Sequence, residues 1–156
     1  MADLHIDDFY KDVAAILLRL YSLFPRKQIL FVDDVLRSQG CKGDEPDEFG
    51  LPSPRFLSCF SAMVWLGEEN FLRYEAPIRQ EALDQVVLTE KGFLLLSSRS
   101  EISLMLDEGE DDNLPPSVMA ASHTNIAQLR RALESGSSII TGQCVQHLLL
   151  TARAPS

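Results

Sequence analysis

The sequence has few cysteines and no hydrophobic signal at its start. Among its 156 residues are three cysteines, Cys41, Cys59 and Cys144, an odd number with no close pair. Such a set does not indicate a disulfide framework and is typical of a protein in a reducing compartment. The first residues are acidic and lack the apolar region of a secretory signal. We therefore expect a cytoplasmic protein.

Long apolar runs are also lacking. The longest apolar-leaning stretch, residues 139–150, is interrupted by threonine, glycine, glutamine and histidine. It is shorter than the ~20 residues that a helix needs to cross a bilayer. The sequence thus predicts no membrane partner.

Positive charge is scarce. The chain carries 14 Lys and Arg against 23 Asp and Glu, a net charge of −9, and neither half is basic. Affinity for nucleic acid comes mostly from Lys and Arg that neutralise phosphates. An acidic chain can therefore bind DNA only if it gathers its few bases on one face.

The motifs that carry chemistry are missing as well. The sequence has no phosphate-binding glycine motif, no serine elbow and no metal motif. Cys144 and His147 stand three residues apart and would share a helix face, but a metal needs further ligands, so a buried thiol is favoured. We expect no enzyme, no cofactor, no metal site and no small-molecule ligand.

Apolar periodicity predicts the first elements. Apolar residues recur every three or four positions from Ile6 to Phe24, with Asp12 and other polar residues between them, and Pro25 ends this helix. A short strand at 28–30 and a helix at 32–38 follow. An acidic loop then spans residues 39–52, and Ser53 and Pro54 start a third helix that ends near residue 70.

Two strand-like runs come next, at residues 71–74 and 85–88, and they predict a hairpin with a long tip at 75–84. Thr89 is placed to cap a fourth helix that continues to Leu96. The order helix, strand, helix, helix, hairpin, helix resembles the winged helix-turn-helix superfamily. The resemblance covers about residues 7–98 and is carried by residues 63–72 and 87–92. It implies a mainly α fold with a small β-hairpin.

The resemblance implies a DNA-binding hypothesis. The helix at 54–69 would enter a major groove, and the wing at 71–88 would contact flanking DNA, as in a transcriptional regulator. The DNA-contact residues implied are Arg55, Ser58, Ser61, Trp65, Arg73 and Arg79.

The same helix face also suits a protein partner. Val64 and Trp65 occupy positions where DNA-reading helices often carry bases, and Glu68 and Glu69 follow them. An exposed Val64/Trp65 pair resembles an interface anchor. A third possibility is that Trp65 packs under the acidic loop or the C-terminal helices. The acidic charge favours a regulatory or adaptor module that binds protein.

The remaining sequence predicts a tail to the winged-helix domain at 1–100. Residues 101–116 are acidic and contain Pro115-Pro116, as in a solvated linker, and residues 117–156 form a C-terminal helical extension with helices ending near 135 and 152. These helices either fold back or pair with a second copy. The apolar character of 139–150 favours a homodimer. The dimerisation residues predicted are Ile140, Val145, Leu148 and Leu149.

Overall fold

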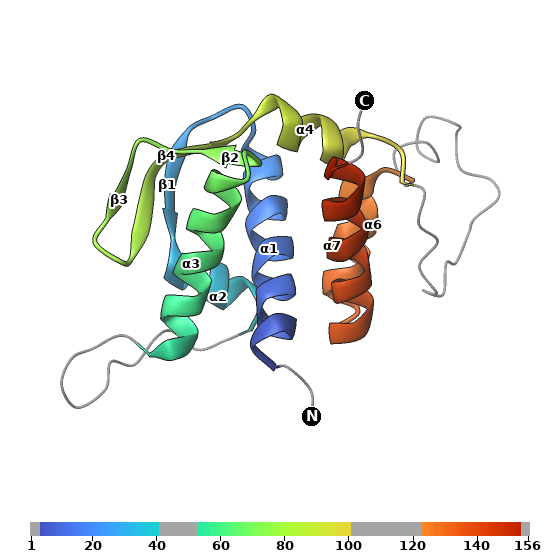
Figure 1. Ribbon diagram of the computed structural model, residues 1–156, viewed down its shortest axis with the longest axis horizontal. Coiled ribbons are helices and arrows are strands. Elements are labelled where there is room, and N and C mark those ends of the chain that lie inside the picture. Colours follow the sequence, from blue (N-terminus) through green and yellow to red (C-terminus); the bar gives the residue numbers. More distant parts are fainter. Residues whose placement is uncertain (1–3, 41–52, 101–122, 154–156) are drawn as a thin grey trace.

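The structure is a computed structural model that describes residues 4–40, 53–100 and 123–153 (Figure 1). It is mainly helical with a small antiparallel sheet, as the sequence predicts at this coarse level. The described elements, in chain order, are α1 (Leu4–Leu23), β1 (Gln28–Phe31), α2 (Val32–Ser38), α3 (Pro54–Glu68), β2 (Leu72–Arg73), β3 (Ala76–Ile78), β4 (Ala82–Leu88), α4 (Glu90–Ser97), α6 (Asn125–Glu134) and α7 (Ser138–Arg153). The predicted acidic linker lies outside the described residues.

Local chemistry sets several element boundaries as predicted. The Ser53 side chain accepts a hydrogen bond from the Phe56 amide at 3.1 Å, with Pro54 in the first turn of α3. Thr89 caps α4 in the same way through the Gly92 amide at 3.1 Å. Thr124 caps α6. Each hydroxyl satisfies an amide that has no partner within its own helix.

The hairpin differs from the prediction. The segment expected to be a long tip contains β3 and the start of β4, with the turn at Arg79 in a left-handed conformation, φ 53°. Gln85 also has a positive φ, 54°, and lies where the register between β1 and β4 shifts. This bulge interrupts the apolar alternation of β4 at Asp84 and Gln85. The sequence pattern therefore revealed only the second half of the strand.

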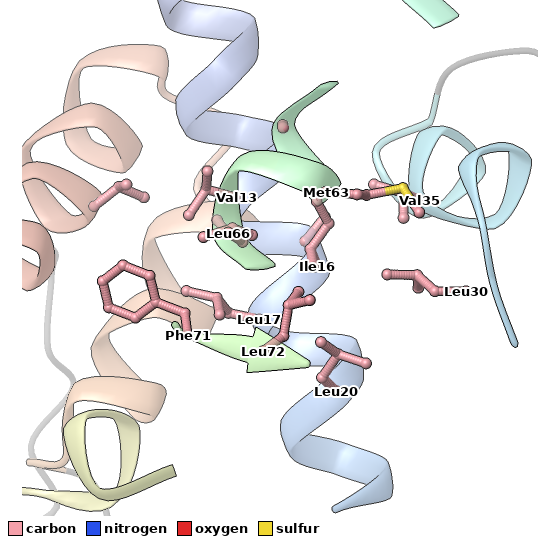
Figure 2. Close-up of a cluster of buried hydrophobic side chains, with 14 of the residues drawn as sticks. Val13, Ile16, Leu17, Leu20, Leu30, Val35, Met63, Leu66, Phe71 and Leu72 are labelled. Carbon is pink, nitrogen blue, oxygen red and sulfur yellow. The ribbon is translucent and has the colours of Figure 1, made fainter. Parts of the chain in front are cut away.

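The sheet has the strand order β1-β4-β2, and β3 also pairs with β4. All pairs are antiparallel. The sheet and α3 lie to one side of α1, whereas α6 and α7 lie to the other (Figure 1). Residues 12–17 of α1 are all buried, so the middle of this helix is enclosed on every side rather than on one face. Figure 2 shows the centre of this core, where Val13, Ile16, Leu17 and Leu20 of α1 lie near side chains of α3, β1 and β2.

The C-terminal helices fold back onto α1. Ile126, Leu129, Val145 and Leu148 belong to the same core as the side chains of α1 and α3. Gly142 of α7 lies against the ring of Tyr10, so that an added Cβ would come within 3.1 Å of that ring. The two predicted segments, 1–100 and 117–156, thus share one hydrophobic core.

Candidate macromolecular interface

A buried ion pair holds the start of α3 against α1. The Arg55 guanidinium donates two hydrogen bonds to the Asp12 carboxylate, Nη1 to Oδ2 and Nη2 to Oδ1, both at 2.7 Å. Asp12 is fully buried, and its Oδ1 also accepts a hydrogen bond from Gln39 Nε2 at 2.7 Å. Asp8 lies 3.6 Å from Arg55 Nε. Gln39 is the first residue of the predicted acidic loop and Arg55 follows the loop, so this cluster joins the chain on both sides of residues 41–52 to α1.

Because of these contacts, the Arg55 guanidinium is not free to make the DNA contact predicted for it. Hydrogen bonding to Asp12 raises the pKa of Arg55 above its ordinary value and outweighs the opposing effect of burial. The bidentate geometry is the one in which an arginine and a carboxylate interact most strongly. A phosphate would have to replace Asp12, leaving a buried carboxylate without a counter-charge. Arg55 is therefore a structural residue here and not a free DNA contact.

Asp12 is the residue that sequence reasoning missed. The sequence pattern places it among the polar residues between the apolar positions of the first helix. Phe9 and Ile16 lie three residues before it and four residues after it, so Asp12 falls on the same helical stripe as these apolar side chains. An acid on that stripe was a signal for a buried pair, but its partner stands 43 residues away.

The outward face of α3 carries no free base. Ser58, Ser61 and Glu68 are exposed, and Arg55 is the one Lys or Arg in the helix. Val64 and Trp65 are half-buried and pack against the core.

Trp65 packs on an element that the sequence did not suggest. Its ring meets the ring of Phe9 edge to face, with centroids 5.2 Å apart and an interplanar angle of 81°. The tryptophan therefore packs on the N-terminal part of α1, while the acidic loop predicted to cover it lies outside the described residues. Val64 and Trp65 are both half-buried, and Ser58 and Ser61 on the same helix are exposed.

The strands that follow α3 and the turn between them carry two exposed arginines. Arg73 follows α3 in β2, and Arg79 lies at the turn between β3 and β4. Because α3 has 15 residues, Arg55 and Arg73 are separated by about the helix length, ~22 Å. The structure thus does not gather Arg55, Arg73 and Arg79 at one place.

Two other bases are engaged locally. Arg19 pairs with Asp34 at 3.4 Å. The Lys91 ammonium donates to the Glu69 carbonyl at 3.0 Å and lies 4.5 Å from the centroid of the Phe71 ring. These contacts leave fewer cations for a phosphate backbone than the composition suggests.

The C-terminal residues predicted for dimerisation occupy different environments. Val145 and Leu148 are buried in the chain's own core, so these side chains are not available to a second copy. Ile140 and Leu149 are half-buried and pack against that core. Ile139 and Leu150 are the large apolar side chains of α7 that face outward, 73% and 59% exposed. The apolar side chains of residues 139–150, which were the reason to predict a dimer, thus pack mostly within the core of a single chain.

The described residues hold no group of three potential metal ligands. Burial raises the pKa of the Cys144 thiol to about 12, so this sulfur stays protonated at neutral pH. Within the described chain, no helix combines the length and apolarity of a membrane span.

Comparisons with known proteins add no family. Neither a protein-family model, nor a curated protein, nor a solved structure matches the chain.

Proposed function

We propose that the chain is a winged helix-turn-helix module without catalytic activity that serves as a regulator or adaptor by binding another protein. Two features support the fold assignment. The element order is the one that the resemblance implies, from α1 through the hairpin to α4. In addition, β1 joins the hairpin as a further strand beside β4. Since a fold alone does not set a function, the choice of partner rests on the α3 surface.

The observation that carries the proposal is the Arg55–Asp12 ion pair. In a DNA-reading winged helix, α3 would lie in the major groove, where arginine and lysine read guanine and approach phosphates. Here the single base of α3 is bound to a buried carboxylate at 2.7 Å. Glu68, at the end of the same helix, is exposed and would repel phosphates. The electrostatics of this face therefore oppose DNA.

The same face has the composition of a protein-binding surface. Ser58 and Ser61 are small and exposed, and they adjoin the half-buried Val64 and Trp65. Small side chains let a partner approach the helix closely, and an accessible tryptophan edge is a frequent anchor in interfaces. Glu68 at the border favours a partner with basic residues at its rim.

A DNA-binding role is the second candidate, and the wing is the observation in its favour. Arg73 and Arg79 are exposed, and no ion pair involves them within the described part of the chain. In this alternative the wing supplies the phosphate contacts while α3 contributes little. In such a protein, Arg73 and Arg79 would be the main positive charges that contact DNA.

Fluorescence anisotropy separates the two candidates. Wild type and an Arg73→Ala/Arg79→Ala variant are titrated against random duplex DNA at low and moderate salt. The protein-binding proposal predicts no salt-sensitive binding by either protein. Binding by wild type that weakens with salt and disappears in the variant would support the DNA alternative instead.

A photocrosslinking residue tests the α3 face directly. The crosslinker replaces Ser61 in one variant and Gln146, which is exposed on α7, in a control variant. The proposal predicts one specific protein adduct at position 61 that Trp65→Ala abolishes. Equal adducts at both positions would contradict a binding site on α3.

A further inference from the structure

The outer edge of β1 is unpaired within the described residues. β1 pairs with β4 alone, and just after it the Val32 amide donates to the Glu81 carbonyl at 2.9 Å. Backbone groups alternate between the two edges of a strand, so the N–H and C=O groups of Ile29 and Phe31 point away from β4. A strand with such a free edge is a template for another strand.

This edge also carries exposed apolar side chains. Ile29 and Phe31 are 40% and 44% exposed, whereas Leu30 between them is fully buried in the core. Phe31 and Ile78 both lie opposite Ala82 in the register, so the three side chains form one row across the sheet, with Ala82 buried between the exposed Phe31 and Ile78. Free edges are usually protected by lysine, proline or an inward charge. The middle of β1 has none of these.

From these features we infer that β1 pairs with β1 of a second copy, forming a continuous antiparallel sheet around a two-fold axis. The inference concerns self-association and stands apart from the α3 surface. The proposed register places Ile29 of one copy opposite Phe31 of the other, because this pairing uses the outward backbone groups of both residues in each copy. The two-fold axis then passes beside Leu30. Pairs of a β-branched and an aromatic residue are among the more favourable cross-strand neighbours.

Charge complementarity selects a second copy as the occupant. In this register Lys27, just before β1, comes opposite the start of α2 of the second copy, whose first turn carries Asp33. No ion pair involves Lys27 or Asp33 among the described residues, whereas Asp34 is already paired with Arg19. Parallel pairing would instead bring like charges together. The edge is thus complementary to itself only in the antiparallel direction.

Sedimentation equilibrium over a range of protein concentrations tests the inference. Wild type is expected to shift from the chain mass of 17.4 kDa toward twice that mass as concentration rises. Phe31→Asp is expected to abolish the shift. Ile139→Asp on α7 is the matched control, since it places the same charge on another exposed apolar residue, and it should leave the shift unchanged. Circular dichroism and thermal unfolding verify that each variant is folded.

A charge swap keeps the test valid if Phe31→Asp fails to fold. Lys27→Asp and Asp33→Lys should each raise the dissociation constant by about tenfold, because two attractive pairs become repulsive. The Lys27→Asp/Asp33→Lys double variant should restore the wild-type value. A wild-type chain that stays monomeric at every concentration would overturn the inference. So would a dimer that is lost in Ile139→Asp, or one that none of the β1 variants weakens.

Discussion

At the residue scale, one ion pair governs both the position of α3 and the character of its surface. Asp12 has no exposure to solvent, and its carboxylate is satisfied by Arg55 and Gln39. Removing one member of a buried pair is far more costly than replacing both, because an unpaired buried charge remains. Substitution of either Asp12 or Arg55 alone is therefore expected to destabilise the protein.

Arg55→Met tests this dependence. We expect the free energy of unfolding to fall by about 3 kcal/mol, because Asp12 is left charged and buried. Urea denaturation measures the loss, with Arg73→Met as the control, since Arg73 is exposed and should cost less than about 0.5 kcal/mol. The Asp12→Leu/Arg55→Met double variant should recover part of the stability. Equal small losses for Arg55→Met and Arg73→Met would show that the pair is not a structural one.

Cys144 gives a pH dependence whose sign follows from its burial. The folded state raises the pKa of this thiol from its ordinary value of 9.0 to about 12. Between these values the unfolded chain loses the proton and the folded chain retains it, so stability is complete below pH 9 and declines as pH rises toward 12. Urea denaturation at pH 7, 9 and 10.5 should show a smaller decline for Cys144→Ala than for wild type. Equal declines would mean that the buried thiol does not contribute.

At the element scale, the helix beginnings were predictable and the sheet was only partly so. Ser53 and Thr89 cap helices through contacts within three residues, which a sequence pattern contains. The division of the hairpin was not predictable, because the bulge at Gln85 depends on pairing with β1, more than fifty positions earlier. The Arg55–Asp12 pair escaped prediction for a similar reason, since its two residues lie 43 positions apart and a periodic pattern does not reveal that the middle of α1 is enclosed on all sides.

The junction between β2 and α4 depends on a close backbone approach at Gly92. A Cβ at this position would overlap the carbonyl oxygen of Phe71, which accepts a hydrogen bond from the Thr89 amide at 3.1 Å. We expect Gly92→Ala to destabilise the protein by about 2 kcal/mol, even though alanine favours a helix. Gly142→Ala is the matched control. Its Cβ meets only the Tyr10 ring, which can shift, so thermal unfolding should show a clearly smaller loss.

At the scale of the whole molecule, the C-terminal helices complete the core of the first hundred residues. The apolar content of residues 139–150 is the reason for predicting a dimer from the sequence. Periodicity, however, does not say whether a helix buries its apolar face against its own chain or against a second copy. Val145 and Leu148 are buried in the same core as α1. The prediction of homodimerisation remains, now located on β1.

Removal of α6 and α7 should therefore abolish cooperative folding. A fragment of residues 1–100 would expose the side of α1 that Ile126, Leu129, Val145 and Leu148 cover. We expect it to bind a hydrophobic dye and to lose the sharp thermal transition of the full chain. A fragment that unfolds cooperatively near the wild-type midpoint would contradict the shared core and identify residues 1–100 as an autonomous domain.

We propose that α3 does not bind DNA, because its one cation, Arg55, is held by the buried carboxylate of Asp12. The most direct measurement is the salt dependence of random-duplex binding by wild type and by Ser58→Arg/Ser61→Arg, which places two free arginines on the exposed face of α3. We predict no salt-sensitive binding by wild type. The variant should gain binding whose affinity falls with salt, with a logarithmic slope of about −1.8 for two phosphate contacts. Steep, salt-sensitive binding by wild type, unimproved in the variant, would contradict the account.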